Sequence, residues 1–200
     1  MEGAKNAAIS AEKNMEKGKA AGKISAKRMA FIAIMAAVIC TSSPFSIPIG
    51  PIPISLANLV IWTAVYLLGA VDGTISTIIF ILLGAVGLPV FSGGAGGLAK
   101  LTGATGGYII GYIFMALVAG FIMEAAKRKT IPTFLAFILG DAICYVIGTA
   151  WFVHLTGKTL AASMSLCVTP FIPGDLIKIA LSIAIGMSVR KALMKASIME

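Results

Sequence analysis

The stretch PFIPGDLIKIALSIAIG at residues 170–186 is an apolar run that contains two opposite charges, Asp175 and Lys178. A charge inside a membrane helix costs at least about 2.5–3.5 kcal/mol, so each one requires an explanation. The two residues lie three apart and share one helix face, where they can pair with each other or bind one polar ligand. The run therefore predicts a membrane helix with either a structural ion pair or a ligand site. We favour the ligand site, because intramembrane charges are usually functional.

The composition of the whole chain is that of a membrane protein. Of its 200 residues, 58% are hydrophobic and only 12% are charged. Three scattered cysteines and a single histidine argue against a metal site and a disulfide framework. The basic residues lack the aromatic neighbours of a nucleic-acid surface. We therefore expect no metal, no cofactor and no nucleic-acid partner.

The chain contains six apolar runs that approach the roughly 20 residues needed to cross a bilayer. The predicted spans cover residues 29–45, 55–71, 74–88, 107–126, 132–153 and 174–189. Asp72 and Gly73 are predicted to form the turn between the second and third spans. The sequence thus predicts an all-α membrane protein, with a basic tail at residues 1–28 and one six-helix domain at residues 29–195.

The basic residues predict the orientation of these spans. All sixteen except Lys100, Lys158 and Lys178 lie in the tail, in KRK at residues 127–129, or near the C-terminus. Positive charges favour the cytoplasmic side, so both termini are predicted to be cytoplasmic. Residues 44–53, 91–106 and 154–173 then form the outer loops. Four prolines predict an extended ribbon in the first of these loops.

Familiar catalytic and nucleotide-binding motifs are incomplete or absent. TGKT at residues 156–159 lacks the earlier glycine of a P-loop, because that position is Phe152. GGAGG at residues 93–97 lacks the last glycine of a dinucleotide motif, because that position is Ala99. HExxH, GxSxG and paired catalytic carboxylates do not occur. We expect a protein that is not an enzyme and that energises no process by itself.

Glycines cluster in SGGAGGLAKLTGATGGY at residues 92–108. Glycine permits positive φ and a close approach of the backbone to a ligand, or it simply makes a loop flexible. The apolar neighbours Phe91, Leu98 and Leu101 favour an ordered loop. We predict that this loop contributes to a ligand site through Gly93, Gly94, Gly96 and Gly97.

Three further features have both a structural and a functional interpretation. Asp141 is predicted to hydrogen-bond between helices in the inner half of its span, away from the outer loops. Tyr108 and Trp151 either belong to an interfacial aromatic belt or line an outer pocket. Ala33 and Ala37 form a small-residue stripe that lets a helix of this chain or of a partner approach closely.

The chain resembles the BioY biotin transporters nearly end to end after the tail. The similarity is carried, in order, by IPIGPIPISL at 47–56, GAVGLPVFSGGAGGLAKLTGATGGYIIGY at 84–112, CYVIGTAWF at 144–152 and PFIPGDLIKIALS at 170–182. These transporters are substrate-binding S components of energy-coupling factor (ECF) importers. The resemblance implies a six-helix S-component bundle in the lipid of the cell membrane that captures biotin at its outer face. It also implies two kinds of partner, a transmembrane energising subunit and two cytoplasmic ATPase subunits.

The resemblance also implies roles for individual residues. Asp175 and Lys178 match a GDxxK motif that contacts biotin. Ala33 and Ala37 match the stripe that docks the energising subunit.

Two positions depart from the family pattern. Some members carry a polar residue and an arginine that reach the biotin tail, where this chain has Ala95 and Ile109. Lys100, the only charge in the glycine-rich loop, is therefore the predicted partner of the biotin carboxylate, with a solvated lysine as the alternative. Tyr108 or Trp151 would pack against the rings. Two other functions remain open: an S component for another vitamin, such as thiamine or riboflavin, and a membrane scaffold.

Overall fold

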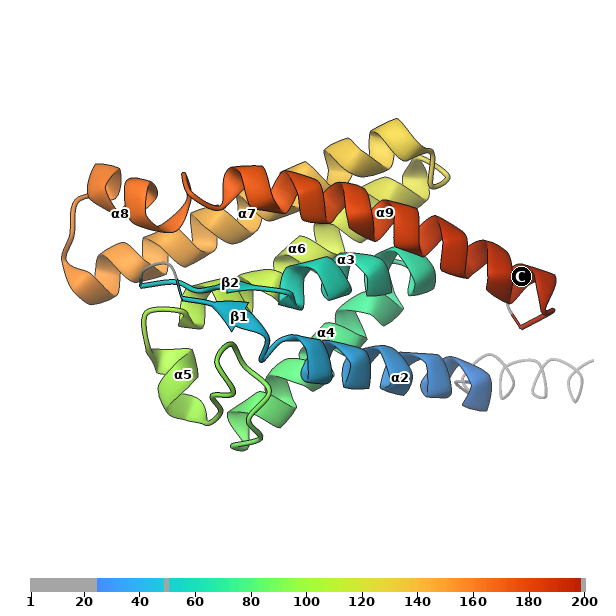
Figure 1. Ribbon diagram of the computed structural model, residues 1–200, viewed down its shortest axis with the longest axis horizontal. Helices are drawn as coiled ribbons and strands as arrows, with labels where there is room; N and C mark the ends of the chain where they lie inside the picture. The colour runs from blue at the N-terminus through green and yellow to red at the C-terminus, as the bar shows by residue number, and fades with distance from the viewer. Residues whose placement is uncertain (1–24, 49–50, 199–200) are drawn as a thin grey trace, which may run out of the picture. The chain divides into compact units, whose positions relative to one another are not determined.

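The computed structural model describes residues 25–48 and 51–198, so most of the predicted basic tail lies outside the described residues. The chain divides into two compact units, Met1–Phe31 and Ile32–Glu200, and the arrangement given below is that of the second unit. The described ranges form eight helices and one two-stranded sheet (Figure 1). The helices are α2 (Ala26–Ser42), α3 (Ala57–Leu68), α4 (Ala70–Ala85), α5 (Leu98–Thr102), α6 (Gly106–Ala125), α7 (Thr130–Thr156), α8 (Leu160–Cys167) and α9 (Ile172–Lys195), and the strands are β1 (Ser46–Ile47) and β2 (Ile54–Ser55).

Three helices in the described part of the chain, α6, α7 and α9, are long and apolar enough to cross a membrane. Helices α3 and α4 are apolar but shorter. At 1.5 Å per residue, α3 extends only about 18 Å, against roughly 30 Å of hydrocarbon in a bilayer. The prediction of a helical protein is confirmed, and three of the six predicted spans have full spanning length.

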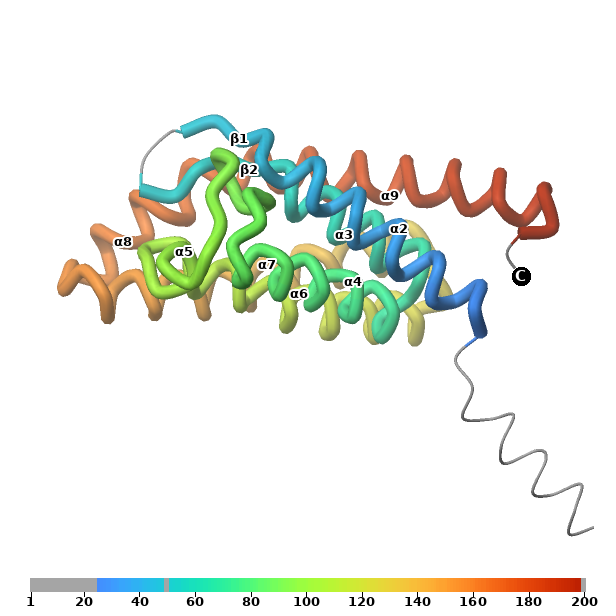
Figure 2. Tube along the Cα trace, turned by 90° about the horizontal axis from the view of Figure 1, so that it is seen from below, coloured from blue at the N-terminus to red at the C-terminus, as the bar shows by residue number. Residues whose placement is uncertain are grey.

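The helices pack in pairs through close backbone contacts. Helices α6 and α7 form an antiparallel hairpin joined by residues 126–129, while α3 packs against α9 and α4 packs against α6 (Figures 1 and 2). Gly120 on α6 lies so close to the start of α4 that an added Cβ would overlap the Cα atom of Ala70. Small residues allow such close helix approach, so Gly120 is a packing requirement.

The turn between the second and third predicted spans lies at Gly69, and the prediction of a turn at Asp72 and Gly73 is wrong. Gly69 has a positive φ of 91°, and its N–H donates to the Val65 carbonyl at 2.8 Å, which ends α3. Gly73 lies inside α4, where an added Cβ would come within 2.7 Å of the Val65 Cα. The small size of Gly73 therefore allows close helix packing. The local sequence does not show whether a glycine is needed for packing or for a turn.

The proline-rich segment is extended, as predicted. Strands β1 and β2 pair antiparallel, with Ser46 opposite Ser55 and Ile47 opposite Ile54. Proline cannot donate to a strand ladder, which keeps this β1–β2 ribbon short. The Ser55 hydroxyl donates to the Ser43 carbonyl at 2.9 Å and so ties the ribbon to the end of α2.

Residues 154–173 contain helix α8, whereas the sequence predicted only a loop. Thr159 caps this helix, because its hydroxyl accepts a hydrogen bond from the Ala162 N–H at 3.4 Å. The preceding helix α7 ends at Gly157, which has a left-handed φ of 67°. Glycine after one helix and threonine before the next are both ordinary boundary signals.

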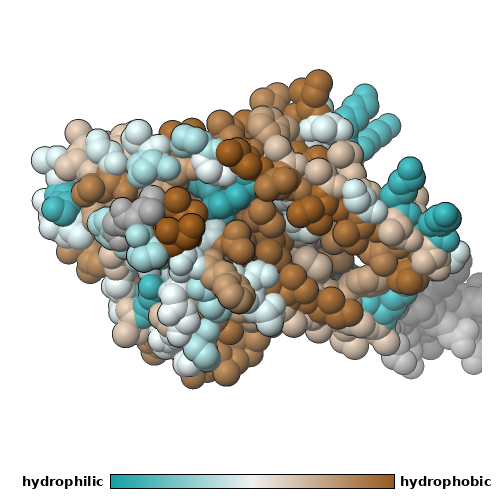
Figure 3. All heavy atoms as spheres, viewed as in Figure 1, coloured by the Kyte–Doolittle hydropathy of each residue, from teal (hydrophilic) through white to brown (hydrophobic). Residues whose placement is uncertain are grey.

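The connecting segments gather at opposite ends of the second unit. The β1–β2 ribbon, α5 and α8 lie at one end, and the 126–129 turn and the last turns of α9 lie at the other (Figures 1 and 2). Strongly hydrophilic side chains project from the latter end, while hydrophobic ones cover the helices between the two (Figure 3). The described basic residues at the hydrophilic end are Lys127, Arg128, Lys129, Arg190, Lys191 and Lys195.

Gly120→Ala should destabilise the protein, because overpacking a close contact costs about 1–3 kcal/mol. The measurement is the thermal unfolding midpoint of the purified protein in detergent, followed by circular dichroism. Gly174→Ala is the matched control, since an added Cβ at Gly174 meets nothing within 4 Å. Equal unfolding midpoints for the two variants would show that the packing of α4 against α6 does not require this close approach.

Candidate functional site

A cavity of about 40 Å³, lined by both polar and apolar side chains, lies where α3, α6, α7 and α9 meet the β1–β2 ribbon. We call it the ionic compartment, because its wall includes two carboxyl side chains and one ammonium from α7 and α9. It is lined by Ile52, Pro53, Ser55, Asn58, Tyr108, Tyr112, Asp141, Cys144, Tyr145, Cys167, Phe171, Asp175 and Lys178. The sequence-predicted residues Asp175, Lys178 and Tyr108 are thus brought together in one cavity.

Asp175 and Lys178 form an ion pair, with the Lys178 Nζ atom 2.9 Å from the Asp175 Oδ1 atom. Only 4% of Asp175 and 9% of Lys178 is exposed. Pro173 is the second residue of α9, and Asp175 lies in the first turn of this helix, where the helix dipole favours a negative charge. The predicted i,i+3 pairing is therefore present, and it is buried.

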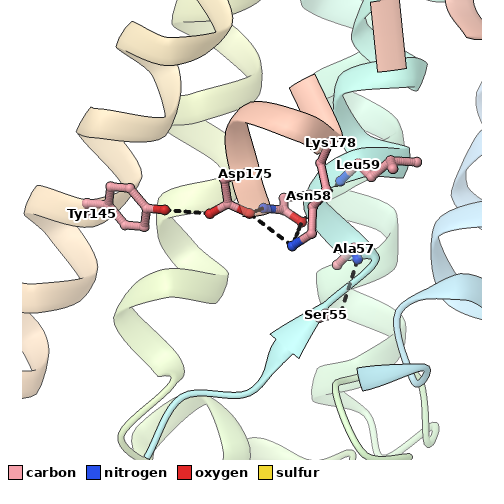
Figure 4. Close-up of polar contacts among 7 residues, drawn as sticks. All are labelled: Ser55, Ala57, Asn58, Leu59, Tyr145, Asp175 and Lys178. Carbon is pink, nitrogen blue, oxygen red and sulfur yellow. Dashed lines mark hydrogen bonds and ion pairs between the residues drawn. The ribbon is translucent and has the colours of Figure 1, made fainter. Parts of the chain in front are cut away.

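Asn58 on α3 bridges the two charges, as Figure 4 shows. Its Nδ2 atom donates to Asp175 Oδ1 at 2.8 Å, and its Oδ1 atom accepts from Lys178 Nζ at 3.2 Å. The Tyr145 hydroxyl on α7 donates to the other Asp175 oxygen, Oδ2. One carboxylate thus connects α3, α7 and α9, and neither Asn58 nor Tyr145 was predicted from the sequence.

The unused hydrogen-bonding capacity of this cluster defines what it can bind. A carboxylate offers about four acceptor positions, and three donors reach Asp175, which leaves one position on Oδ2. An ammonium has three N–H donors, and Lys178 uses two of them. The Asn58 amide has one N–H left after its bond to Asp175. The site therefore suits an uncharged group that carries N–H donors beside a carbonyl acceptor.

Asp141 lies on the wall of the same compartment, which corrects its predicted position away from the outer loops. It is only 8% exposed and interacts electrostatically with Asp175 and Lys178. It also lines a second, mainly apolar cavity of about 190 Å³ between α7 and α9. Asp141 and Tyr145 are four residues apart and therefore lie on one helix face. This spacing could have indicated that both line the same cavity.

A third cavity, of about 30 Å³, adjoins the ionic compartment beneath the β1–β2 ribbon. We call it the hydroxyl compartment, because its polar side chains all carry hydroxyl groups. It is lined by Ser43, Ile52, Pro53, Ser55, Phe80, Phe91, Ser92, Thr105, Tyr108, Ile109 and Tyr112. The residues shared with the ionic compartment are Ile52, Pro53, Ser55, Tyr108 and Tyr112.

The glycine-rich loop uses its backbone groups to fold on itself and on neighbouring segments. Gly93, Gly94 and Gly97 have positive φ, and their N–H groups donate to the carbonyls of Pro44, Phe91 and Gly84. At Gly96, an added Cβ would overlap the Leu88 carbonyl. None of these four glycines lines either compartment. They position Ser92, and direct contact with a ligand remains a prediction.

The other predicted ligand-binding residues are separated by the fold. Tyr108 lines both compartments, and its hydroxyl lies 2.9 Å from the Thr149 hydroxyl. The Trp151 indole donates to the Gly103 carbonyl at 3.0 Å and lies outside both linings. Lys100 on α5 is also outside both linings. The predicted roles of Trp151 and Lys100 in binding therefore gain no support from their positions.

The predicted docking stripe lies on an outward face of α2. Ala33 and Ala37 are both exposed, whereas Met35 and Ile39 on the same helix are buried. Helix α2 thus packs by one face and leaves the small residues accessible on another.

Asn58 could have been identified from the sequence by its chemistry. It is the only amide side chain in the apolar run of residues 55–71. Polar residues in such runs usually face the bundle interior and bind a partner there. Its partners could not have been identified, because they lie 117 and 120 residues away along the chain.

Nearly the whole chain is similar to one family of known proteins. Residues 13–195 match the BioY family. The chain is 34% identical to biotin transporter BioY2 of Lactococcus lactis subsp. cremoris, over 82% of this chain and 91% of that relative. It is 35% identical to biotin transporter BioY of Thermotoga maritima, over 79% and 92% of the two chains. The crystal structure of an S-component for biotin from an ECF-type ABC transporter matches with a TM-score of 0.77 and 34% identity, covering 84% of this chain and 95% of that one.

Removing one member of the Asp175–Lys178 pair should destabilise the protein more than removing both. Lys178→Met leaves a buried carboxylate without its cation, and breaking a buried pair in this way costs about 3–5 kcal/mol. Asp175→Asn leaves the ammonium unpaired, while the double variant removes both charges. We expect the unfolding midpoint of each single variant to lie below that of the double variant. The reverse order would show that the two charges do not depend on each other.

Proposed function

This chain belongs to the BioY family, and we infer from this premise that it serves biotin uptake as the S component of an ECF transporter. Support comes from the relatives named biotin transporters and from the similar biotin S-component structure. The family expected from the sequence is confirmed. The chain is a multi-pass membrane protein, and its family consists of transporters rather than enzymes.

The free hydrogen-bonding capacity of the ionic compartment supports its assignment as the binding site for the biotin ring. The ureido ring of biotin has two N–H donors beside one carbonyl acceptor. The carbonyl accepts from the free N–H of Lys178 or Asn58, and one ring N–H donates to the free position on Asp175. Asp141, on the same wall, accepts from the second ring N–H. Such charge-assisted bonds are about twice as strong as neutral ones.

Biotin binding requires the two compartments to widen. Their volumes are about 40 and 30 Å³, whereas ligand pockets usually measure roughly 300–1,000 Å³. Both share Ile52, Pro53 and Ser55 of the ribbon segment as one wall. Because the ribbon is held by a two-residue strand pair and by the hydrogen bond from Ser55 to Ser43, it can move outward to admit biotin and then return to cover it.

The orientation follows from the charge distribution. The end that carries the 126–129 turn and the last turns of α9 has hydrophilic side chains (Figure 3), and the sequence of these two segments contains six basic residues. The positive-inside rule places this end in the cytoplasm, together with both termini of a six-span bundle. The ribbon, α5 and α8 then face outward, where biotin arrives.

Release to the cytoplasm requires energy that this chain does not supply. We assign that step to a transmembrane energising subunit and two cytoplasmic ATPase subunits of the ECF type. The exposed Ala33 and Ala37 on α2 form the docking surface for the energising subunit, because small side chains let a partner helix approach closely.

Asp175→Asn should weaken biotin binding by more than about tenfold, because a charged acceptor is lost from the ureido site. Asp141→Asn should weaken binding in the same direction. The measurement is equilibrium binding of radiolabelled biotin to purified protein in detergent, with unfolding midpoints recorded for each variant.

Asp72→Asn is the matched control, since Asp72 is a carboxylate outside both compartments. A folded Asp175→Asn variant with unchanged affinity would refute the assignment of Asp175. Wild-type protein that fails to bind biotin would refute the proposed substrate, and riboflavin or thiamine binding would then identify another vitamin.

The proposed orientation predicts which positions a membrane-impermeant maleimide can reach in intact cells. The two variants are Lys158→Cys, in the segment between α7 and α8, and Lys129→Cys, in the turn before α7. Both native lysines are exposed. We expect labelling at position 158 in intact cells and at position 129 only after the membrane is opened. A background that lacks Cys40, the native cysteine that is not buried, limits unrelated labelling. The opposite labelling pattern would invert the topology.

A further inference from the structure

The hydroxyl compartment contains no charged side chain in its lining. Its polar wall consists of the hydroxyl groups of Ser43, Ser55, Ser92 and Thr105, together with those of two tyrosines. Lys100 does not reach it. Any anion held here must be bound by neutral donors.

Two of the residues that carry these hydroxyl groups are mostly buried, and neither hydroxyl group has a hydrogen-bond partner within residues 25–48 and 51–198. Ser43 is 2% exposed and Thr105 is 8% exposed. Ser55, by contrast, donates to the Ser43 carbonyl and accepts from the Ala57 N–H at 3.1 Å. Because Ser43 and Thr105 line the cavity and their hydroxyl groups make no hydrogen bond within these residues, both groups can donate to a ligand there.

The first turn of the 20-residue helix α6 forms one side of the compartment. Thr105 is the residue that precedes this helix, and its side chain makes no capping bond. Tyr108, Ile109 and Tyr112 follow on the face that lines the cavity. The N-terminus of a helix carries a partial positive charge that favours an anion. Two independent features, the free hydroxyls and the helix end, therefore point to the same chemistry.

Charge also determines which end of the ligand can lie here. The ionic compartment holds two acidic side chains, Asp141 and Asp175, and a single ammonium, that of Lys178, which already pairs with Asp175. A ligand carboxylate finds no free cation there, whereas the adjoining hydroxyl compartment has no acidic side chain among its described lining residues.

We propose that the hydroxyl compartment is the subsite for the carboxylate of the ligand tail, a proposal that rests on the proposed function. The Ser43, Ser92 and Thr105 hydroxyl groups donate to the carboxylate oxygens, and the N-terminus of α6 faces the charge. Lys100 has no part in this contact. Neutral donors thus take the place of the cation expected from the sequence.

Competition binding with biotin and biotin methyl ester tests this subsite, because the ester keeps the rings and loses the charge. Wild-type protein should prefer biotin. Thr105→Val replaces the hydroxyl with a methyl group of similar size. It should reduce this preference about tenfold, mainly by weakening the binding of biotin rather than that of the ester. Thr105→Ser keeps the hydroxyl and should retain the preference. Lys100→Met should also retain it.

Several outcomes would overturn the proposal. A preference that survives in a folded Thr105→Val variant and in Ser43→Ala, or one that is lost in Lys100→Met, would assign the carboxylate to another group. Wild-type protein that binds biotin and its ester equally would refute the subsite alone. Wild-type protein that binds neither ligand would refute the proposed function together with this subsite.

Discussion

The Asp175 carboxylate accepts hydrogen bonds from three helices at once: from Lys178 on its own helix α9, from Asn58 on α3 and from Tyr145 on α7. A charge buried without such partners would cost several kcal/mol, so the positions of these helices and the ionised carboxylate depend on each other. The same cluster leaves one acceptor position and two N–H donors unused. Under the proposed function, the atoms that hold these helices together are also those that bind the ureido group.

The distance between the walls of the site is set by glycines on α6 and α7. An added Cβ at Gly148 would overlap the Tyr108 ring, and one at Gly107 would overlap the Trp151 side chain. The absence of side chains at these positions lets the Tyr108 ring lie flat against α7 and line both compartments. Glycine thus shapes the site mainly through helix packing, while the glycines of the outer loop shape it by placing Ser92.

Much of the fold and part of the site could be predicted from the sequence. Apolar run length located the longer helices but not α5 and α8, which lie in segments predicted as loops, and the prolines predicted the extended ribbon. The sequence also predicted that Asp175 and Lys178 would meet, because spacing within one helix determines that geometry. Asn58 and Asp141 were missed or misplaced as members of the site, since their positions depend on contacts between helices far apart in the chain. Lys100 was chosen by its charge alone, without knowledge of where α5 would place it.

The sequence by itself determined what is local: which residues are apolar enough to enter a membrane, which segment prolines keep extended, and which side chains share a helix face. Only the tertiary structure decided that Gly69 rather than Gly73 makes the turn, that Asp141 faces the ionic compartment, and that the neighbouring cavity is lined with hydroxyl groups. The physical reason is that local spacing constrains rotation within one helix. It does not constrain which faces of different helices pack together, and the compartments exist only between those faces.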